Sequence, residues 1–508
     1  MLKRNLIANY LGQGWNALMG FAFIPVYIHY IGIESYALIG LFGVITAGLN
    51  LLDMGMTPTM SREMARFTGG EHSPESIRDL LRSIEIITLS VAALIAGTIT
   101  LGSHWLASSW LRAEELPVAM VAQAFTIMGL VSALRFIETI YLSSLVGLQR
   151  QVLLNALKSA LATLRGLGAV AILVWVSPTI QSFFIWQGLI SLATLAILVF
   201  TVYRILPQAK RPSQFSWPAI RHVWRYAGGM MGISFLAFLL TQVDKILLSK
   251  LLSLADYGYY TLAGTVASAL YVMLIGPITQ AWFPRLTQLH TAQDSSTLIE
   301  VYHQGAQLVT VTVGSAALVL IFFTQTFLLL WTQNSELAQQ TAPLLRLLVL
   351  GTLLNSSMSI PYQTQLAYGW TGLGLRINTV AVLFIVPAIL WVTPRYGAMG
   401  AASAWVSLNA GYLLSGIHFM YSRILKTEKW RWYRQDLLHP LLCGTIAAAT
   451  VHWLLPASVG VFPQLATLFL ASVCTFIATM LGAHRVRHRA KIVFFSFLRA
   501  LVSKRLRG

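Results

Sequence analysis

Ionisable side chains stand inside apolar segments of this 508-residue chain, where a charge is costly. The stretch TQVDKILL places Asp244 and Lys245 side by side, and Arg135 precedes Glu138 by one helical turn. Neighbours in a helix point about 100° apart, so Asp244 and Lys245 cannot pair with each other, whereas Arg135 and Glu138 share a face. Asp244 and Lys245 must each find water or another partner, which favours a role beside a polar path through a membrane.

Amide side chains and further charges extend this candidate site. Asn9, Gln13 and Asn16 recur at helical spacing, and large amides are costly when they face lipid. Arg346 stands near the end of an apolar segment, where snorkelling to the interface explains it equally well. The predicted lumen residues are Asn9, Gln13, Asn16, Arg135, Glu138, Lys245, Arg346 and Asn355, and the predicted coupling-ion residues are Asp53 and Asp244.

The sequence does not indicate metal binding, disulfide bonds or ATP hydrolysis. Cys443 and Cys474 both lie in apolar segments and are interpreted as packing residues, and the histidines show no metal-ligand spacing. The chain contains no Walker A motif. We therefore predict no metal site, no cofactor and no enzyme active site, and we leave open coupling to H⁺ or Na⁺.

The composition explains where these charges stand. The chain is 56% hydrophobic and 10% charged, with a mean hydropathy of +0.68, whereas a soluble protein carries about 25% charged residues. Apolar runs of about 20 residues recur along its length. This pattern predicts an all-α polytopic membrane protein of about 14 spans, at residues 7–28, 36–57, 82–104, 118–142, 152–176, 182–203, 226–250, 256–279, 304–331, 343–368, 373–393, 398–420, 437–456 and 463–482.

The distribution of basic residues predicts the topology. With the N-terminus inside, most of the 35 Lys and Arg residues, Arg165 among them, fall in cytoplasmic connections. This asymmetry predicts a multi-pass membrane protein with both termini in the cytoplasm. The net charge of +18 would then face anionic membrane lipids, and we expect no nucleic-acid partner.

A weak internal repeat predicts the domain organisation. ESYALIGLFGVI, beginning at Glu34, aligns with ADYGYYTLAGTV, beginning at Ala255, which favours duplication of a six-helix unit. Two such pseudo-symmetric lobes are typical of transporters that alternate access around a central cavity. The predicted parts are an N-lobe at 1–205, a cytoplasmic linker at 206–221, a C-lobe at 222–421, two further helices at 422–482 and a basic amphipathic cytoplasmic tail at 483–508.

Four stretches together resemble the polysaccharide transporter family, of the O-antigen flippase type, in the multidrug/oligosaccharidyl-lipid/polysaccharide (MOP) superfamily. They are NLIANYLGQGWNALMGFAFIPVYIHYIGIESYALIGL, LLDMGMTPTMSREMAR, GLQRQVLLNALKSALATLRG and TQVDKILLSKLLSLADYGYYTLA. The resemblance implies a flippase in the bacterial inner (cytoplasmic) membrane. It would move undecaprenyl-diphosphate-linked oligosaccharide repeat units from the cytoplasmic to the periplasmic leaflet, for O-antigen, capsule or exopolysaccharide. It also implies a cationic lumen, here Arg135, Lys245 and Arg346, and polysaccharide polymerase and chain-length proteins as partners.

Three other functions remain as alternatives. A multidrug or cation exporter of the same superfamily would need an acidic cavity, and a lipid II flippase would share the fold. A membrane polysaccharide polymerase would need an acidic or arginine-rich external catalytic loop, which the short predicted outer loops do not provide.

Overall fold

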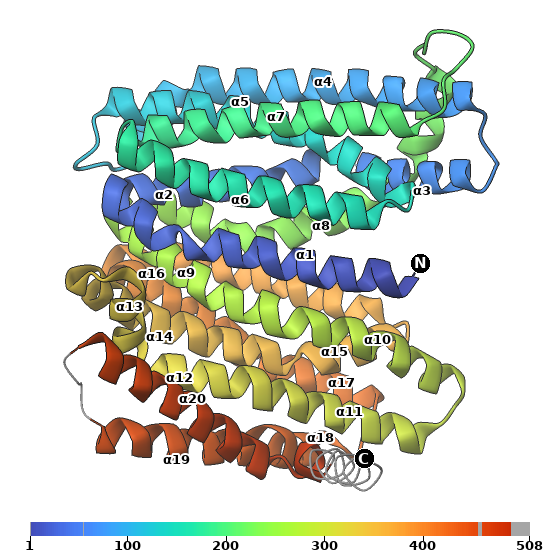
Figure 1. Cartoon of the computed structure of the whole chain (residues 1–508). Coiled ribbons are helices and arrows are strands. Elements are labelled where there is room, and N and C mark those ends of the chain that lie inside the picture. Colours follow the sequence, from blue (N-terminus) through green and yellow to red (C-terminus); the bar gives the residue numbers. More distant parts are fainter. Residues whose placement is uncertain (1, 54, 456–459, 489–508) are drawn as a thin grey trace, which may run out of the picture. The chain divides into compact units, whose positions relative to one another are not determined.

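The computed structural model describes residues 2–53, 55–455 and 460–488, and every regular element among them is helical. The chain divides into two compact units, Met1–Thr261 and Leu262–Gly508, with the division inside one helix. We call them unit 1 and unit 2 and describe each by itself (Figure 1). The predicted all-helical, multi-span fold is confirmed.

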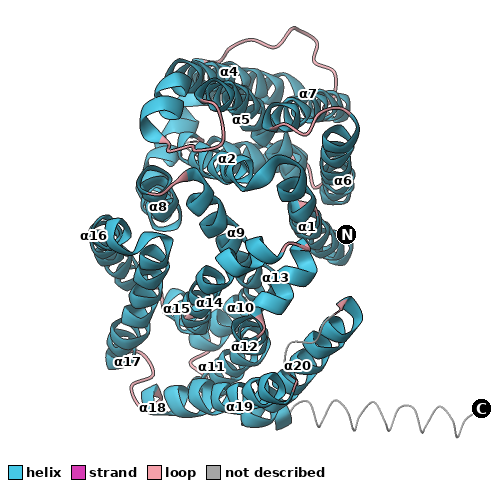
Figure 2. Cartoon of the chain, turned by 90° about the vertical axis from the view of Figure 1, so that its left-hand side faces the viewer, coloured by secondary structure: helices cyan, strands magenta, loops and turns pink. Residues whose placement is uncertain are grey.

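Unit 1 is built from long helices. They are α1 (Leu2–Ala22), α2 (Ile24–Leu52), α3 (Met56–Thr68), α4 (Pro74–Trp105), α5 (Val118–Gly147), α6 (Gln151–Trp175), α7 (Ile180–Ile205), α8 (Trp217–Leu251) and the first half of α9 (Leu254–Leu270), with a π-helical turn at Leu106–Trp110 after α4. Within it α5 packs against both α4 and α7, and α1 lies along α6 (Figures 1 and 2).

Unit 2 continues α9 and adds shorter helices. They are α10 (Gly276–Thr291), α11 (Ser295–Val309), α12 (Ser315–Phe322), α13 (Thr324–Thr332), α14 (Ser335–Ser357), α15 (Ser359–Ala367), α16 (Thr371–Gly411), α17 (Ile417–Arg423), α18 (Lys429–Arg431), α19 (His439–Leu454) and α20 (Val461–Gly482). Short π-helical segments join some of these helices end to end: Tyr271–Ile275 lies between α9 and α10, Thr310–Gly314 between α11 and α12, Tyr412–Gly416 between α16 and α17, and Trp432–Leu438 between α18 and α19. The neighbouring pair α19 and α20 packs side by side (Figure 2).

Among the described residues, 11 helical stretches are long and apolar enough to cross a membrane. The difference from the predicted number arises partly because α16 counts once, although Gly397 interrupts it with a φ of 58°. Gly32, at φ 77°, likewise interrupts α2. Because a side chain makes this region of backbone space costly, a single glycine allows each helix to change direction without a loop.

Two predicted span boundaries were wrong. The first span was expected to run unbroken through Phe23, but α1 ends at Ala22 and α2 begins at Ile24. The span expected at 304–331 instead runs from Ser295 to Phe322, and α13 is a separate short helix. The Thr324 hydroxyl donates to the carbonyl oxygen of Ile321 at 3.0 Å. Such a side-chain bond satisfies one of the carbonyl groups that a helix leaves without a partner at its C-terminal end.

The connection between α7 and α8 forms hydrogen bonds with side chains in the N-terminal half of α4. Arg78 Nε donates to the Pro207 carbonyl oxygen at 2.9 Å, and Asp79 Oδ1 accepts from the Gln214 backbone N–H at 2.7 Å. The Ser216 N–H donates to Ser83 Oγ at 2.8 Å. These bonds fix the start of α8, the helix that carries Asp244.

At the opposite end of α4, Glu34 organises the connection to α5. Its side chain is almost fully buried, and its two carboxylate oxygens accept backbone N–H groups from Glu114, Glu115 and Leu116 at 2.9, 3.1 and 3.0 Å. The Leu254 N–H donates to the Arg112 carbonyl oxygen at 2.8 Å, so the same connection also holds the start of α9.

We expect Glu34→Ala to lower the free energy of unfolding by about 3 kcal/mol, because three backbone N–H groups lose the buried carboxylate that accepts their hydrogen bonds. Thermal unfolding of the purified protein in detergent measures the loss. Glu115→Ala, which removes an exposed carboxylate from the same connection, is the matched control and should unfold like the wild type. Equal stability of Glu34→Ala and Glu115→Ala would contradict this role.

Candidate functional site

Five polar residues meet among three apolar helices of unit 1, and we call them the arginine cluster: Arg135 and Glu138 on α5, Arg165 on α6, and Gln187 and Ser191 on α7. Arg135 Nη2 donates to Gln187 Oε1 at 3.1 Å, and Arg165 Nη2 donates to Ser191 Oγ at 3.5 Å. Glu138 interacts electrostatically with both guanidinium groups. The cluster thus ties α5, α6 and α7 together through polar contacts inside apolar helices.

Aromatic rings hold the arginines from other sides. The Arg135 guanidinium carbon lies 4.6 Å from the centre of the Phe42 ring, which α2 contributes. Trp186 Nε1 donates to the Arg165 carbonyl oxygen at 3.1 Å, and Gly168 leaves room for the same indole because a Cβ there would lie 2.0 Å from it. A cation over an aromatic face is stabilised by the ring quadrupole, so Phe42 stabilises the charge of Arg135.

The arginine cluster is not neutral. It holds two guanidinium groups and one carboxylate. In the described part of the chain, Arg135 Nε, Arg165 Nε and Glu138 Oε1 are buried and lack a hydrogen-bond partner. Guanidinium groups present planar sets of N–H donors that match phosphate and carboxylate oxygens. An excess cation with unused donors inside an apolar bundle can bind an anionic group.

Sequence reasoning missed three of these five residues. Arg165 was assigned to a cytoplasmic connection, which is wrong, because it lies in the middle of α6, half-buried, beside Glu138. Gln187 and Ser191 were not singled out. Their spacing of four residues within the apolar stretch 180–205 was the available signal, because it places both on one face of a helix.

A second polar site in unit 1 surrounds Asp244 on α8. Tyr260 on α9 donates its hydroxyl to Asp244 Oδ2 at 3.0 Å, while Asp244 Oδ1 is buried and has no hydrogen-bond partner among the described residues. Lys245 Nζ donates to Gln242 Oε1 at 3.4 Å. Asp244 and Lys245 therefore have separate polar partners, as the helical geometry requires.

The amide residues of α1 contact α6. Asn9 Nδ2 donates to Gln151 Oε1 at 3.0 Å, and Asn155 Nδ2 donates to Asn9 Oδ1 at 2.5 Å. Asn16 instead donates to the Gly12 carbonyl oxygen of its own helix at 2.6 Å, and Gln13 is exposed. Asn9 thus joins α1 to α6, and these hydrogen bonds of Asn9 and Asn16 do not reach the arginine cluster.

The remaining predicted residues have other surroundings. Asp53 follows α2 and accepts from the Thr57 N–H at 3.1 Å, and burial raises the pKa of Asp53 despite this bond. In unit 2, Asn355 Nδ2 donates to Asn409 Oδ1 at 2.8 Å between α14 and α16, and Arg346 is exposed on α14. Their predicted roles in the lumen and in ion coupling stay predictions.

Comparison with known proteins identifies the family. A family model described as "Polysaccharide biosynthesis protein" matches residues 2–290, more than half of the chain. The chain belongs to this family. The predicted resemblance is thereby confirmed at the level of the family. No curated protein sequence matches this polysaccharide biosynthesis protein.

Solved structures share the fold. "Lipid II flippase MurJ, inward closed conformation" has a TM-score of 0.67 at 13% identity and covers 94% of this chain and 98% of its own. An inward-facing multidrug resistance MATE family transporter of the MOP superfamily has a TM-score of 0.64 at 15% identity, over 82% of this chain and 96% of its own. A mutant of the Vibrio cholerae MATE transporter VcmN has a TM-score of 0.56 at 17% identity, and the match covers 84% of this chain and 97% of the VcmN chain. The chain therefore shares the fold of these transporters.

We expect Glu138→Gln to destabilise the protein by about 3 kcal/mol, because it leaves Arg135 and Arg165 facing each other without a compensating charge. Removing one of the two cations as well, in Glu138→Gln/Arg165→Gln, should recover part of this loss. Thermal unfolding of the single and double variants forms a double-mutant cycle. Strictly additive effects would show that Glu138 and Arg165 do not interact.

Proposed function

We propose that this protein is a flippase that moves undecaprenyl-diphosphate-linked oligosaccharide repeat units from the cytoplasmic to the periplasmic leaflet of a bacterial inner membrane. The repeat units would serve surface polysaccharide synthesis, as O-antigen, capsule or exopolysaccharide. The observation that carries the proposal is the arginine cluster, where two arginines outnumber one glutamate inside apolar helices of a polysaccharide biosynthesis protein. We further propose that both termini lie in the cytoplasm and that polymerase and chain-length proteins receive the product.

The physical chemistry of the substrate matches this site. Each sugar hydroxyl that crosses hydrocarbon without a hydrogen bond costs several kcal/mol, roughly 2–7. Polar side chains along a path through the protein replace those hydrogen bonds while the lipid tail stays in the bilayer. The diphosphate carries the negative charge, and guanidinium groups bind phosphate oxygens in pairs. Arg135 and Arg165 are the residues we propose for this contact.

The membrane potential adds to the driving force. Outward movement of an anion is downhill in a cell that is negative inside, by about 2.3 kcal/mol per charge per 100 mV. A coupled ion is therefore not required by the energetics. If one is used, Asp244 is the proposed H⁺ or Na⁺ site, because one of its buried oxygens lacks a partner among the described residues. Asp53 is the second candidate for ion coupling.

The fold itself leaves two rivals, since MATE transporters and a lipid II flippase share it. A cation exporter would need an excess of acidic side chains around its substrate. In the described part of unit 1, the arginine cluster has the opposite balance, which favours an anionic substrate. The substrate of a lipid II flippase also contains a diphosphate, so the two proposed functions differ only in the sugar part of the substrate.

The test is a gene deletion followed by analysis of lipid-linked sugars and surface polysaccharide. The proposal expects complete, unpolymerised repeat units to accumulate on undecaprenyl diphosphate in the cytoplasmic leaflet, with loss of surface polymer. Single units that still reach the surface would indicate a polymerisation component instead. Unchanged polysaccharide with raised toxin sensitivity would support the exporter.

Arg135→Gln/Arg165→Gln should reduce complementation of that deletion by at least about tenfold, because the diphosphate loses both charged partners. Surface polysaccharide, normalised to the amount of protein in the membrane, is the measurement. Arg204→Gln is the matched control, since it removes an exposed arginine at the C-terminal end of α7, outside the arginine cluster. Full complementation by a normally expressed double variant would show that transport does not require Arg135 and Arg165.

Asp244→Asn should impair transport more than folding, because the amide keeps the size of the side chain and can accept from Tyr260 but cannot carry charge. The amount of protein in the membrane and the complementing activity should be measured on the same cells. Tyr260→Phe separates the hydrogen bond from the charge and should have the smaller effect on transport. Normal protein level with normal transport in Asp244→Asn would refute a functional role for this carboxylate.

A further inference from the structure

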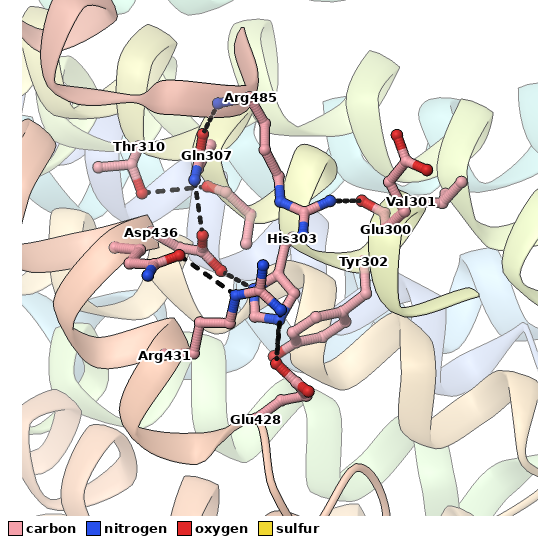
Figure 3. A network of polar contacts seen from close by, with 12 residues as sticks. Glu300, Val301, Tyr302, His303, Gln307, Thr310, Glu428, Arg431, Asp436 and Arg485 are labelled. Carbon is pink, nitrogen blue, oxygen red and sulfur yellow. Dashed lines mark hydrogen bonds and ion pairs between the residues drawn. The ribbon is translucent and has the colours of Figure 1, made fainter. Parts of the chain in front are cut away.

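Unit 2 contains a buried polar network at the end where α10 turns into α11 and where α20 ends (Figure 3). His303 on α11 is fully buried, with Nδ1 against an Asp436 carboxylate oxygen and Nε2 2.9 Å from Glu428 Oε2. Gln307, one turn further along α11, donates to Asp436 Oδ1 at 2.9 Å. This network joins α11 to the segment that contains α18 and the π-helical Trp432–Leu438.

The same network also holds the residues that follow α20. Gln307 Oε1 accepts the backbone N–H of Arg485 at 2.8 Å, so Gln307 bridges Asp436 and the segment at 483–488. Arg485 Nη1 donates to the Glu300 backbone carbonyl oxygen at 3.4 Å. On the other side, Arg431 contacts Glu428 Oε2 through Nη1 at 3.4 Å and Gln435 Oε1 through Nε at 3.2 Å. Arg431 and Arg485, from distant parts of the chain, thus lie at the edge of the buried network and are held by contacts to its neighbours.

These two arginines line one cavity of about 390 Å³. Its lining is polar and basic, and consists of Glu300, Gln304, Gln307, Arg431, Gln435, His484, Arg485 and His488. The lining holds two arginines and one carboxylate, that of Glu300, and Glu428 contacts Arg431 beside it. This size accommodates a phosphate group with part of what is attached to it.

The cavity brings like charges together. Burial and the neighbouring positive charge of Arg431 lower the pKa of Arg485, while the carboxylates of Asp436, Glu300 and Glu428 act in the opposite direction. Arg431 Nη2 and Arg485 Nε and Nη2 make no hydrogen bond to any residue within 2–53, 55–455 and 460–488. An anion that accepted hydrogen bonds from both guanidinium groups would relieve this repulsion and use the free donors.

We propose that this cavity is a binding site for a phosphate-bearing anion, with Arg431 and Arg485 as its charged ligands and the polar residues of the lining as further donors. The anion is either the headgroup of an anionic phospholipid or a free phosphate compound. The span Val461–Gly482 ends immediately before Arg485, and α20 exposes large apolar side chains such as Phe469, which places the cavity where a lipid headgroup could reach it. The site lies within unit 2 and does not depend on which substrate the protein transports.

Two probes test the proposal on the purified full-length chain. Native mass spectrometry counts phosphatidylglycerol molecules retained, with phosphatidylcholine as the neutral lipid, and a thermal-shift titration with inorganic pyrophosphate tests a free anion. We expect binding of at least one anionic probe, and about tenfold weaker binding in Arg431→Gln/Arg485→Gln. Preference for phosphatidylglycerol identifies a lipid site, and binding of pyrophosphate without anionic lipid identifies a site for free phosphate compounds.

Arg434→Gln is the matched control, because it removes an exposed arginine from the same π-helical segment without touching the cavity lining, and it should bind like the wild type. Arg431→Gln alone covers the case in which the double variant fails to fold, because the Arg431 side chain is 42% exposed. The proposal is overturned if neither probe binds, or if Arg431→Gln and Arg434→Gln bind both probes as the wild type does.

Discussion

The cost of placing charge inside an apolar helical bundle is the constraint on which this structure depends. A guanidinium or carboxylate group taken out of water must find an opposite charge, a hydrogen-bond partner or a hydrated path. In unit 1 the charged groups stabilise one another: Glu138 on α5 interacts with Arg135 on the same helix and with Arg165 on α6. Gln187 and Ser191 on α7 accept hydrogen bonds from the two arginines. The balance of these charges leaves one cation in excess, and that excess is the basis on which we propose an anionic substrate.

The same constraint explains how the surrounding helices are held. Glu34 lies deep in unit 1, where three backbone N–H groups stabilise its charge and fix the connection before α5. Asp79 holds the connection before α8 in a similar way. In unit 2, His303 lies between Asp436 and Glu428. Buried ionisable groups therefore hold the connections and helix ends, while the apolar helix faces supply most of the packing.

Helical periodicity predicted much of this arrangement from the sequence. It placed Arg135 and Glu138 on one face and separated Asp244 from Lys245, because these relations are set within one helix. It could not identify Gln187 or Arg165 as partners of α5, because that depends on which helices pack together. The breaks at Phe23 and Phe323 were missed for a related reason, since hydropathy averaged over about 20 residues does not register a local interruption.

The central claim is that the protein recognises a diphosphate on its substrate. Proteoliposomes containing the purified chain can be loaded with either a diphosphate-linked oligosaccharide lipid or a neutral lipid that carries the same oligosaccharide and the same tail. The measurement is the rate at which each lipid reaches the other leaflet. The account predicts movement of the diphosphate-linked lipid, and little movement of the neutral one. Equal rates for the two lipids, or transport of neither, would contradict it.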